Sequence, residues 1–305
     1  MTSVLLTGAS GYVGKAFIER AEGLDITSID RVIDNSIRAK CSTCIEADLN
    51  ELSENQKDLL QDFEGIVIHL AAARSDEETE NVYERDNLKA TNGLLSALDG
   101  QKILKFIHVG SVAAIDGEQL YREAIVPSNS DDWYRLTKYR QQVLVSEWSQ
   151  LFDIPLTILA PSAIYDANAG ANSTNIGRLE GLVSNLKLAP SINVLKSLTA
   201  MDLIVEAINT TIFVDGKSNH EKYLVIDRPT KTVTEICQDK FEARVVVRVP
   251  FLKNLLLLVA FILKTLGLKR KIPLTRERVL KLYKSTNYLA DKDYRDWENV
   301  IFKLN

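Results

Sequence analysis

The beginning of the chain carries the feature that most limits how it can fold. An apolar run ending at Leu6 leads directly into three glycines, Gly8, Gly11 and Gly14, spaced G-x-x-G-x-x-G. A continuous apolar run is typical of a buried parallel strand, and glycines at this spacing allow a tight turn, close approach to a diphosphate and close helix packing. The pattern predicts an α/β protein with a Rossmann-like, doubly wound parallel sheet and a dinucleotide site at its first turn.

The helix after this turn should begin near Tyr12. Backbone N–H groups at the start of a helix bind anions because they lack partners within the helix and the helix dipole is positive there. We therefore expect cofactor contacts from Ser10, Tyr12 and Val13 as well as from the three glycines. A purely structural turn is the alternative, and an acidic residue downstream, Asp30, argues against it.

A second predicted strand, residues 26–30, ends in this acidic residue. A carboxylate at this place can accept hydrogen bonds from the ribose hydroxyls of adenosine. It would repel the 2′-phosphate of NADP, so the sequence favours NAD, with NADP the less favoured cofactor. Arg31 could stack on adenine or bind a phosphate. A simple turn role for Asp30 is the alternative interpretation.

The third and fourth predicted strands also run toward the cofactor. Residues 44–49 carry Asp48 near their end, and this acid could bind the adenine amino group. Residues 65–69 lead into small side chains, which let the backbone lie against the cofactor. The cofactor contacts expected from these two segments are Asp48, Leu49, Leu70, Ala71 and Ala72.

Composition limits the partners. The 305 residues are 46% hydrophobic and 26% charged, with a net charge of −4. Nucleic acid or an anionic membrane is therefore not expected as the main partner, since either needs a basic field. Residues 1–3 lack the basic segment of a signal peptide, and we expect a cytoplasmic protein. Three histidines without ligand spacing and three cysteines predict no metal site.

Tyr134 and Lys138 lie four residues apart on a predicted helix of about 133–149, and hence on one face. An ammonium group beside a phenol stabilises the phenolate, so we expect a lowered pKa and a general acid or base at Tyr134. Ser111 follows the predicted strand 102–109 and could hold a substrate hydroxyl or carbonyl. Such a Tyr–Lys pair is common, and it gains weight only from its place after the fifth strand.

In their order and spacing these motifs resemble the extended short-chain dehydrogenase/reductases, the NAD-dependent epimerase/dehydratases of nucleotide sugars. The resemblance covers nearly the whole chain and rests on the glycines, Asp30, Asp48, residues 69–72, Asn87, Tyr134, Lys138, Pro161 and residues 200–203. It implies that Tyr134 is the acid/base, that Lys138 binds the nicotinamide ribose, and that Ser111 is the catalytic serine. Asn87 and Pro161 belong to the cofactor site by the same resemblance.

Two alignments of the serine stay open. The strand register gives Ser111, whereas counting back from Gly117 gives Val112; we favour Ser111, because register is fixed more tightly than loop length. Val112 and Ala113 stand where the dehydratases carry an Asp–Glu pair. Without carboxylates to eliminate water, a 4,6-dehydratase is disfavoured.

The resemblance also divides the chain. It implies an NAD-binding domain of residues 1–165 plus about 200–228. A smaller C-terminal substrate-binding region comprises about 166–199 plus 229–305. Asn175 and Lys196 are the expected substrate contacts, and solvated loop residues are the alternative for each.

The most apolar stretch, residues 251–264, is too short to span a membrane. We expect a buried helix there. An interfacial helix with the basic residues 269–271 at lipid head groups is the alternative, so membrane-surface contact through 251–271 is possible but not favoured.

The functional expectation is an NAD-dependent 4-epimerase of a UDP- or dTDP-activated sugar in surface polysaccharide synthesis. By resemblance it would be a homodimer formed through helices of about 81–98 and 133–149. The alternatives are an NAD(P)H-dependent 4-ketoreductase, a 3β-hydroxysteroid dehydrogenase-like enzyme and a non-catalytic dinucleotide sensor.

Overall fold

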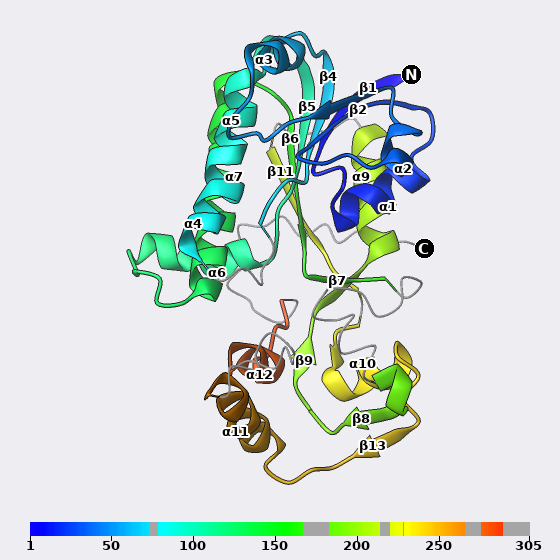
Figure 1. The fold of residues 1–305 in the computed structure, drawn as a ribbon, viewed down its shortest axis with the longest axis vertical. Helices are drawn as coiled ribbons and strands as arrows, with labels where there is room; N and C mark the ends of the chain where they lie inside the picture. Colours follow the sequence, from blue (N-terminus) through cyan, green and yellow to red (C-terminus); the bar gives the residue numbers. More distant parts are fainter. Residues whose placement is uncertain (74–78, 167–182, 214–219, 228, 266–275, 289–305) are drawn as a thin grey trace. The chain divides into compact units, whose positions relative to one another are not determined.

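The computed structural model shows two compact units. Among the described residues, the first comprises those of Met1–Ser162 and Met201–Ile226, and the second comprises those of Ala163–Ala200 and Asp227–Lys292. The residues that the structure describes are 1–73, 79–166, 183–213, 220–227, 229–265 and 276–288 (Figure 1).

The first unit is built on a seven-stranded sheet in which every pairing is parallel. Its strands are β1 (Thr2–Thr7), β2 (Leu24–Asp30), β3 (Thr43–Glu46), β4 (Gly65–His69), β5 (Ile103–Val109), β6 (Leu156–Pro161) and β11 (His220–Val225). The spatial order is β11-β6-β5-β4-β1-β2-β3. This is the Rossmann order, extended by one strand, and it confirms the predicted fold class.

Helices cover both faces of this sheet (Figure 1). They are α1 (Tyr12–Arg20), α2 (Asn35–Arg38), α3 (Glu54–Gln61), α4 (Glu80–Tyr83), α5 (Ala90–Ala97), α6 (Ala113–Arg122), α7 (Ser130–Leu151) and α9 (Met201–Phe213), with a π-helical turn η1 (Glu84–Lys89) and a 3₁₀ turn η2 (Gly100–Lys102). α1 and α9 pack together on one face, and α3, α5 and α7 pack on the other. Arg20 of α1 pairs with Asp202 of α9 at 2.7 Å.

The sheet core forms because the central strands are apolar on both sides. Val4, Leu5 and Leu6 are fully buried, as are Val67 and Phe106 in the neighbouring strands. Buried parallel strands need such continuous apolar runs because helices cover both faces. From β1 the strands are added outward through β2 and β3 on one side, and from β4 onward they are added on the other side of β1. In open α/β sheets, ligands bind at the carboxyl ends of the strands where the strand order reverses in this way.

Three helices of this unit, α2, α3 and α6, were not assigned from the sequence, and α6 is the one beside the site. Residues 113–122 form α6, which packs along α7 so closely that a Cβ on Gly117 would lie 2.0 Å from the carbonyl oxygen of Arg135. The Arg135 guanidinium lies 2.5 Å from Asp131 and 3.6 Å from Asp116 of α6. These contacts hold the chain that follows Ser111 against the helix that carries Tyr134.

The second unit consists of short elements. They are β7 (Ala163–Tyr165), β8 (Leu188–Pro190), β9 (Leu195–Lys196), β10 (Leu198–Ala200), β12 (Lys231–Thr232), β13 (Val245–Val247), α10 (Val233–Asp239), α11 (Leu252–Thr265) and α12 (Arg276–Tyr283). The strands pair as β7 with β10, β8 with β13 and β9 with β12. A separate apolar cluster that includes Ile192, Leu198, Ile236 and Phe241 forms its core.

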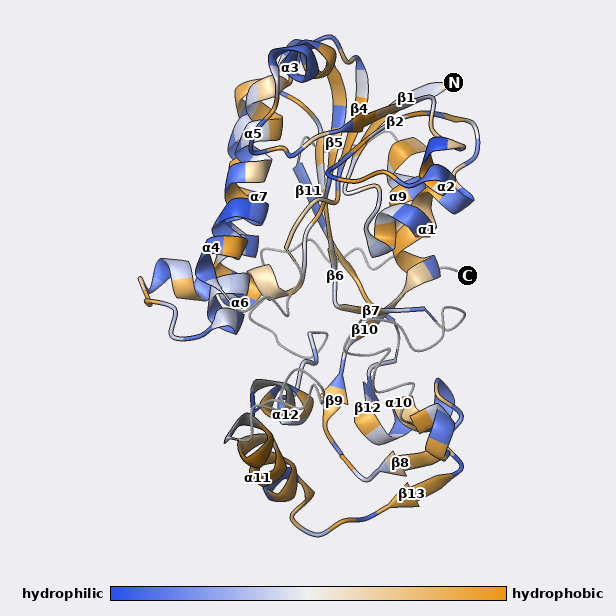
Figure 2. Cartoon of the chain, viewed as in Figure 1, coloured by the Kyte–Doolittle hydropathy of each residue, from blue (hydrophilic) through white to orange (hydrophobic). Residues whose placement is uncertain are grey.

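The expectation of a buried helix at residues 251–264 is wrong for one face of α11. Ala260 and Leu263 are buried, but Leu255, Leu258 and Phe261 are 48%, 55% and 64% exposed. Figure 2 shows α11 coloured as a mainly hydrophobic helix. The side chains of the apolar run extend all round the helix, and the small second unit covers one side of it. None of the helices in the described ranges has the length and apolar content that a membrane crossing requires.

Candidate active site

The glycine turn between β1 and α1 has the close approach that a dinucleotide needs. Gly8 has φ +72°, and a Cβ on it would lie 2.8 Å from the backbone nitrogen of Ala71. A Cβ on Gly14 would lie 2.3 Å from the carbonyl oxygen of Gly8. Tyr12 and Val13 form the first turn of α1, and Gly11, which precedes them, has no side chain to cap that end. The turn therefore fits a diphosphate held by backbone amides.

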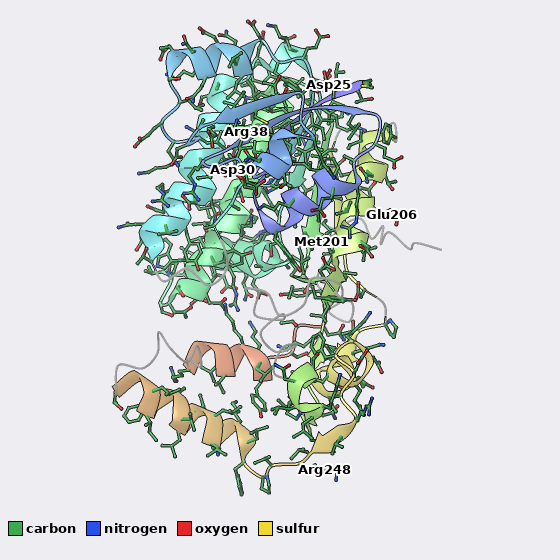
Figure 3. All side chains as sticks on the ribbon, turned by 45° about the vertical axis from the view of Figure 1, so that its right-hand side comes forward. Asp25, Asp30, Arg38, Met201, Glu206 and Arg248 are labelled. Carbon is green, nitrogen blue, oxygen red and sulfur yellow. The ribbon has the colours of Figure 1, made fainter. Side chains whose placement is uncertain are left out.

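Asp30 ends β2 beside this turn (Figure 3). Its carboxylate accepts the backbone N–H of Ser10 at 2.9 Å and that of Arg31 at 2.7 Å. The Ser10 hydroxyl donates to the carbonyl oxygen of Val32, and the Arg31 guanidinium lies 3.5 Å from Asp86. The structure thus brings three of the predicted cofactor residues together.

The end of β4 also borders the glycine turn. The backbone N–H groups of Leu70 and Ala71 both donate to the Thr7 hydroxyl at 3.2 Å, and Ala72 is exposed. Asp48 accepts the backbone and side-chain N–H groups of Asn50 at 2.9 and 2.7 Å. Burial opposes the shift, but these bonds hold the pKa of Asp48 below its usual value.

Leu49 lies in the sheet core, so its side chain serves packing. Pro161, also buried, ends β6, and its carbonyl oxygen accepts the backbone N–H of Val112 at 3.0 Å. This bond places the turn after β5 at the carboxyl end of the sheet. Asn87, fully buried within η1, accepts from the backbone of Ala73 at 2.8 Å and donates to Thr137 at 2.9 Å. The amide of Asn87 thus ties the end of β4 to α7.

The side chain of Ser111 lies within hydrogen-bonding reach of the Tyr134 phenol and favours its ionised form. Ser111 is partly exposed at the start of α6, whereas Val112 is buried. Of the two alignments left open by the sequence, the geometry therefore brings Ser111, and not Val112, to the tyrosine. The ring of Tyr134 also lies 5.7 Å from that of Tyr83.

The expected lowering of the Tyr134 pKa is not found. Burial raises the pKa of Tyr134, the Ser111 side chain acts in the opposite direction, and the negative charge of Asp131 adds to the rise. The ammonium group of Lys138 is engaged elsewhere, because it donates to the side-chain oxygen of Gln141 at 2.8 Å. In this state Tyr134 is a protonated phenol at neutral pH.

Lys138 is itself strongly affected by its surroundings. It is only 3% exposed, and burial lowers its pKa to about 7. Burial disfavours the charged form of an amine, so Lys138 changes charge near neutral pH. A lysine that titrates there is typical of functional sites.

A buried polar chain that was not predicted from the sequence connects Lys138 with the glycine turn. The side-chain N–H of Gln141 donates to Thr91 at 2.9 Å, and His69 contacts Thr91 at 2.9 Å and Thr7 at 2.7 Å. Burial lowers the pKa of His69 to about 3, with a smaller effect from Lys138. The chain therefore consists of a neutral imidazole between two hydroxyls, with Gln141 as its link to Lys138. The spacing of Gln141 from Lys138, three residues along α7, was the signal in the sequence.

The two expected substrate contacts belong to the second unit. Asn175 lies outside the described residues. Lys196, in β9, donates to the carbonyl oxygens of Lys281, at 2.6 Å, and of Lys284 near the end of α12. Burial, with the nearby charge of Lys284, lowers the pKa of Lys196 to about 8. In this structure Lys196 caps a helix, and its role toward a substrate stays a prediction.

A Rossmann sheet with a glycine-rich first turn, joined to a Ser–Tyr pair and a buried lysine on α7, defines a dinucleotide-dependent enzyme of the short-chain dehydrogenase type. The sequence profile of the NAD dependent epimerase/dehydratase family matches residues 4–204. The chain belongs to this family and is an enzyme of it, which argues against the non-catalytic sensor. The family is NAD dependent, and the glycine turn of this chain fits a dinucleotide.

Two curated relatives are informative. The polyketide synthase-nonribosomal peptide synthetase phmA of Phaeosphaeria nodorum is 28% identical over 212 residues, which are 62% of this chain and 5% of the synthetase. The chain thus spans a small part of that relative. An N-acetyl-alpha-D-glucosaminyl-diphospho-ditrans,octacis-undecaprenol 4-epimerase of Escherichia coli O157:H7 is 22% identical over 237 residues, covering 77% of this chain and 70% of the enzyme.

Solved structures show the same fold. The UDP-glucuronic acid 4-epimerase from Bacillus cereus in complex with NAD has a TM-score of 0.59 and 19% identity, covering 81% of this chain and 85% of that one. The terminal R domain from the myxalamid PKS-NRPS biosynthetic pathway has a TM-score of 0.66 and 17% identity, covering 93% of this chain and 77% of that one.

Proposed function

We propose that the chain is an NAD-dependent 4-epimerase of a nucleotide-diphosphate sugar. The observation that carries the proposal is the proximity of the Ser111 and Tyr134 side chains, with Lys138 one turn along α7. The epimerases among its relatives and structural neighbours, one of them with a UDP-sugar and NAD named, support the sugar substrate.

The residues have distinct parts in this proposal. Tyr134 exchanges a proton with a sugar hydroxyl, and Ser111 holds that oxygen by a hydrogen bond. Lys138 supplies a positive charge that titrates near neutral pH. The chemistry that the nicotinamide ring supplies when bound is the acceptance and return of a hydride. The glycine turn, Asp30 and the backbone of residues 70–71 would hold the dinucleotide.

The carboxylate of Asp30 also supports NAD over NADP. It lies beside the turn at the end of β2, where the adenosine ribose is expected, and it would repel a 2′-phosphate. Arg31 does not offset this charge freely, because its guanidinium pairs with Asp86.

A one-way NAD(P)H-dependent 4-ketoreductase is the second candidate. The raised pKa of Tyr134 favours it, because a protonated phenol is ready to donate a proton to a carbonyl oxygen. An epimerase needs Tyr134 first as a phenolate, which accepts the proton of the sugar hydroxyl, and then as the phenol, which returns that proton to the keto oxygen. The two candidates differ in whether the dinucleotide is consumed.

Replacing Tyr134 with Phe tests the proposed acid/base. Positioned proton transfer contributes on the order of 10²- to 10⁴-fold, so Y134F should lose about that much turnover while still binding the dinucleotide. Tyr139→Phe is the matched control, since Tyr139 lies one turn further along α7 with its ring 5.3 Å from Tyr121. Turnover is measured as C4 epimerisation of a nucleotide sugar. Full activity of Y134F would exclude Tyr134 as the acid/base.

A further inference from the structure

The outer face of α11 is an exposed apolar surface. Phe251, Leu255, Leu258 and Ile262 follow one another at helical spacing and are 81%, 48%, 55% and 44% exposed. Residues at such spacing share one face of a helix. The opposite face packs on the rest of the second unit through Ala260 and Leu263, which are buried.

An apolar face of this kind needs an explanation. A helix that is hydrophobic all round is usually covered all round, and contiguous exposed apolar patches mark interaction surfaces. The valines of β13, which precede α11 in the chain, are exposed as well. The apolar surface is therefore broader than one helix.

The charge of the same segment is strongly one-sided. Between Glu242 and Glu277 the chain carries eight Lys and Arg residues and no Asp or Glu, although the whole chain has a net charge of −4. Arg244, Arg248 and Lys253 are exposed in the described part of this segment. Figure 3 labels Arg248, which lies between β13 and α11. The net charge of −4 was the reason for not expecting an anionic partner, but it is a sum over the whole chain and does not report this local basic region.

We propose that the α11 surface, meaning the exposed apolar face of α11 with Arg244 and Arg248, binds the surface of a bilayer that contains anionic lipids. The apolar side chains would enter the boundary between head groups and acyl chains, and Arg244 and Arg248 would face lipid phosphates. Lys253 lies on the other side of α11, over the Tyr283 ring at 5.9 Å. At 14 residues, α11 lies along such a surface and does not cross it.

The charge of the segment also favours an anionic bilayer over a second copy of the chain as the partner of this surface. A two-fold symmetric dimer places the same patch against itself. It would bring two uniformly basic segments together, which costs energy unless anions intervene. An anionic bilayer complements the same charge and accepts the apolar side chains.

The test is flotation of the full chain with phosphatidylcholine vesicles that contain or lack phosphatidylglycerol. We expect binding to the phosphatidylglycerol vesicles, little binding to phosphatidylcholine alone, and weaker binding at high salt, because exposed charges are screened. The double variant Leu258→Ser with Ile262→Ser should lose most of the binding, and Arg248→Gln should weaken it. Leu104→Ser, a change at an exposed leucine of β5, is the control and should bind as the wild type.

Failure of the wild type to float with anionic vesicles would overturn the proposal. Unchanged binding of a folded double variant would overturn it as well. The proposal would also be overturned if the wild type did not bind vesicles and light scattering showed that it is a dimer which the variants convert to a monomer. If the double variant fails to fold by circular dichroism, Arg248→Gln and the salt dependence decide. The readout is partition without substrate, so its failure leaves the proposed catalytic function intact.

Discussion

At the scale of single residues, Gln141 is the side chain that links Lys138 to the buried polar chain. Its oxygen accepts the ammonium at 2.8 Å, and its nitrogen donates to Thr91, which also contacts His69. A buried ammonium without an acceptor would lose its proton more readily. Gln141 is thus a positioning residue, since it acts on the site through Lys138.

Substitutions at Gln141 should move the pH profile in opposite directions. In Gln141→Leu the pKa of Lys138 should fall below its value of about 7. As the pH is raised, activity that needs the charged amine should therefore disappear at a lower pH than in the wild type. In Gln141→Glu the added carboxylate should raise that pKa and extend activity to higher pH. Profiles of kcat against pH for both variants check this. Coincident profiles for wild type and both variants would show that Gln141 does not tune Lys138.

Asp30 should control the choice of dinucleotide. Replacing it with Asn removes the charge that would repel a 2′-phosphate, and we expect the ratio of NADP to NAD affinity to rise on the order of tenfold, or about 1.4 kcal/mol. Asp25→Asn, at the amino end of the same strand, is the control. Calorimetric titration of both dinucleotides gives the ratio. A variant that prefers NAD as strongly as the wild type would contradict the assignment of Asp30 to the ribose.

At the scale of elements, the glycine turn is the part whose geometry is most tightly constrained. A side chain at Gly14 would meet the backbone of Gly8 and Ala9, so α1 would have to move away from the turn. Both the packing of α1 and the approach of a diphosphate depend on this contact.

Gly14→Ala should therefore destabilise the fold by about 1 to 3 kcal/mol through overpacking and abolish dinucleotide binding. Gly23→Ala is the control, because an added Cβ at Gly23 has no atom within 4 Å, although Gly23 itself has a positive φ of +69°. It should lose stability through backbone strain and keep its affinity. Denaturant unfolding and dinucleotide titration measure the two effects. A Gly14→Ala protein that binds NAD normally would contradict the role of the turn.

The strands of the first unit were predictable because the evidence for each of them is local. The run ending at Leu6 and the glycines after it predict β1, its turn and α1 from neighbouring residues alone. The helix α6 was not predicted, because a glycine such as Gly117 lowers the helix propensity of the segment. A glycine is needed there because α6 packs closely against the backbone of Arg135 on α7. The link from Gln141 to Thr91 joins residues fifty positions apart, and no local pattern reports it.

At the scale of the whole molecule, the second unit was least predictable. Its described strands are two or three residues long, too short for alternation of apolar and polar residues to identify them. The homodimer also stays a prediction, and light scattering that shows a monomer at micromolar concentration would contradict it. Which sugar and nucleotide the enzyme takes depends on a pocket shape that sequence patterns do not report.

The most direct test of the 4-epimerase proposal uses the purified wild-type enzyme with a panel of UDP- and dTDP-sugars. We expect one sugar to equilibrate with its C4 epimer, followed by proton NMR, while absorbance at the NADH band shows no net change in the dinucleotide. Stoichiometric consumption of NADH or NADPH with a keto-sugar, and no epimer from any member of the panel, would contradict the proposal and assign the chain to the reductases.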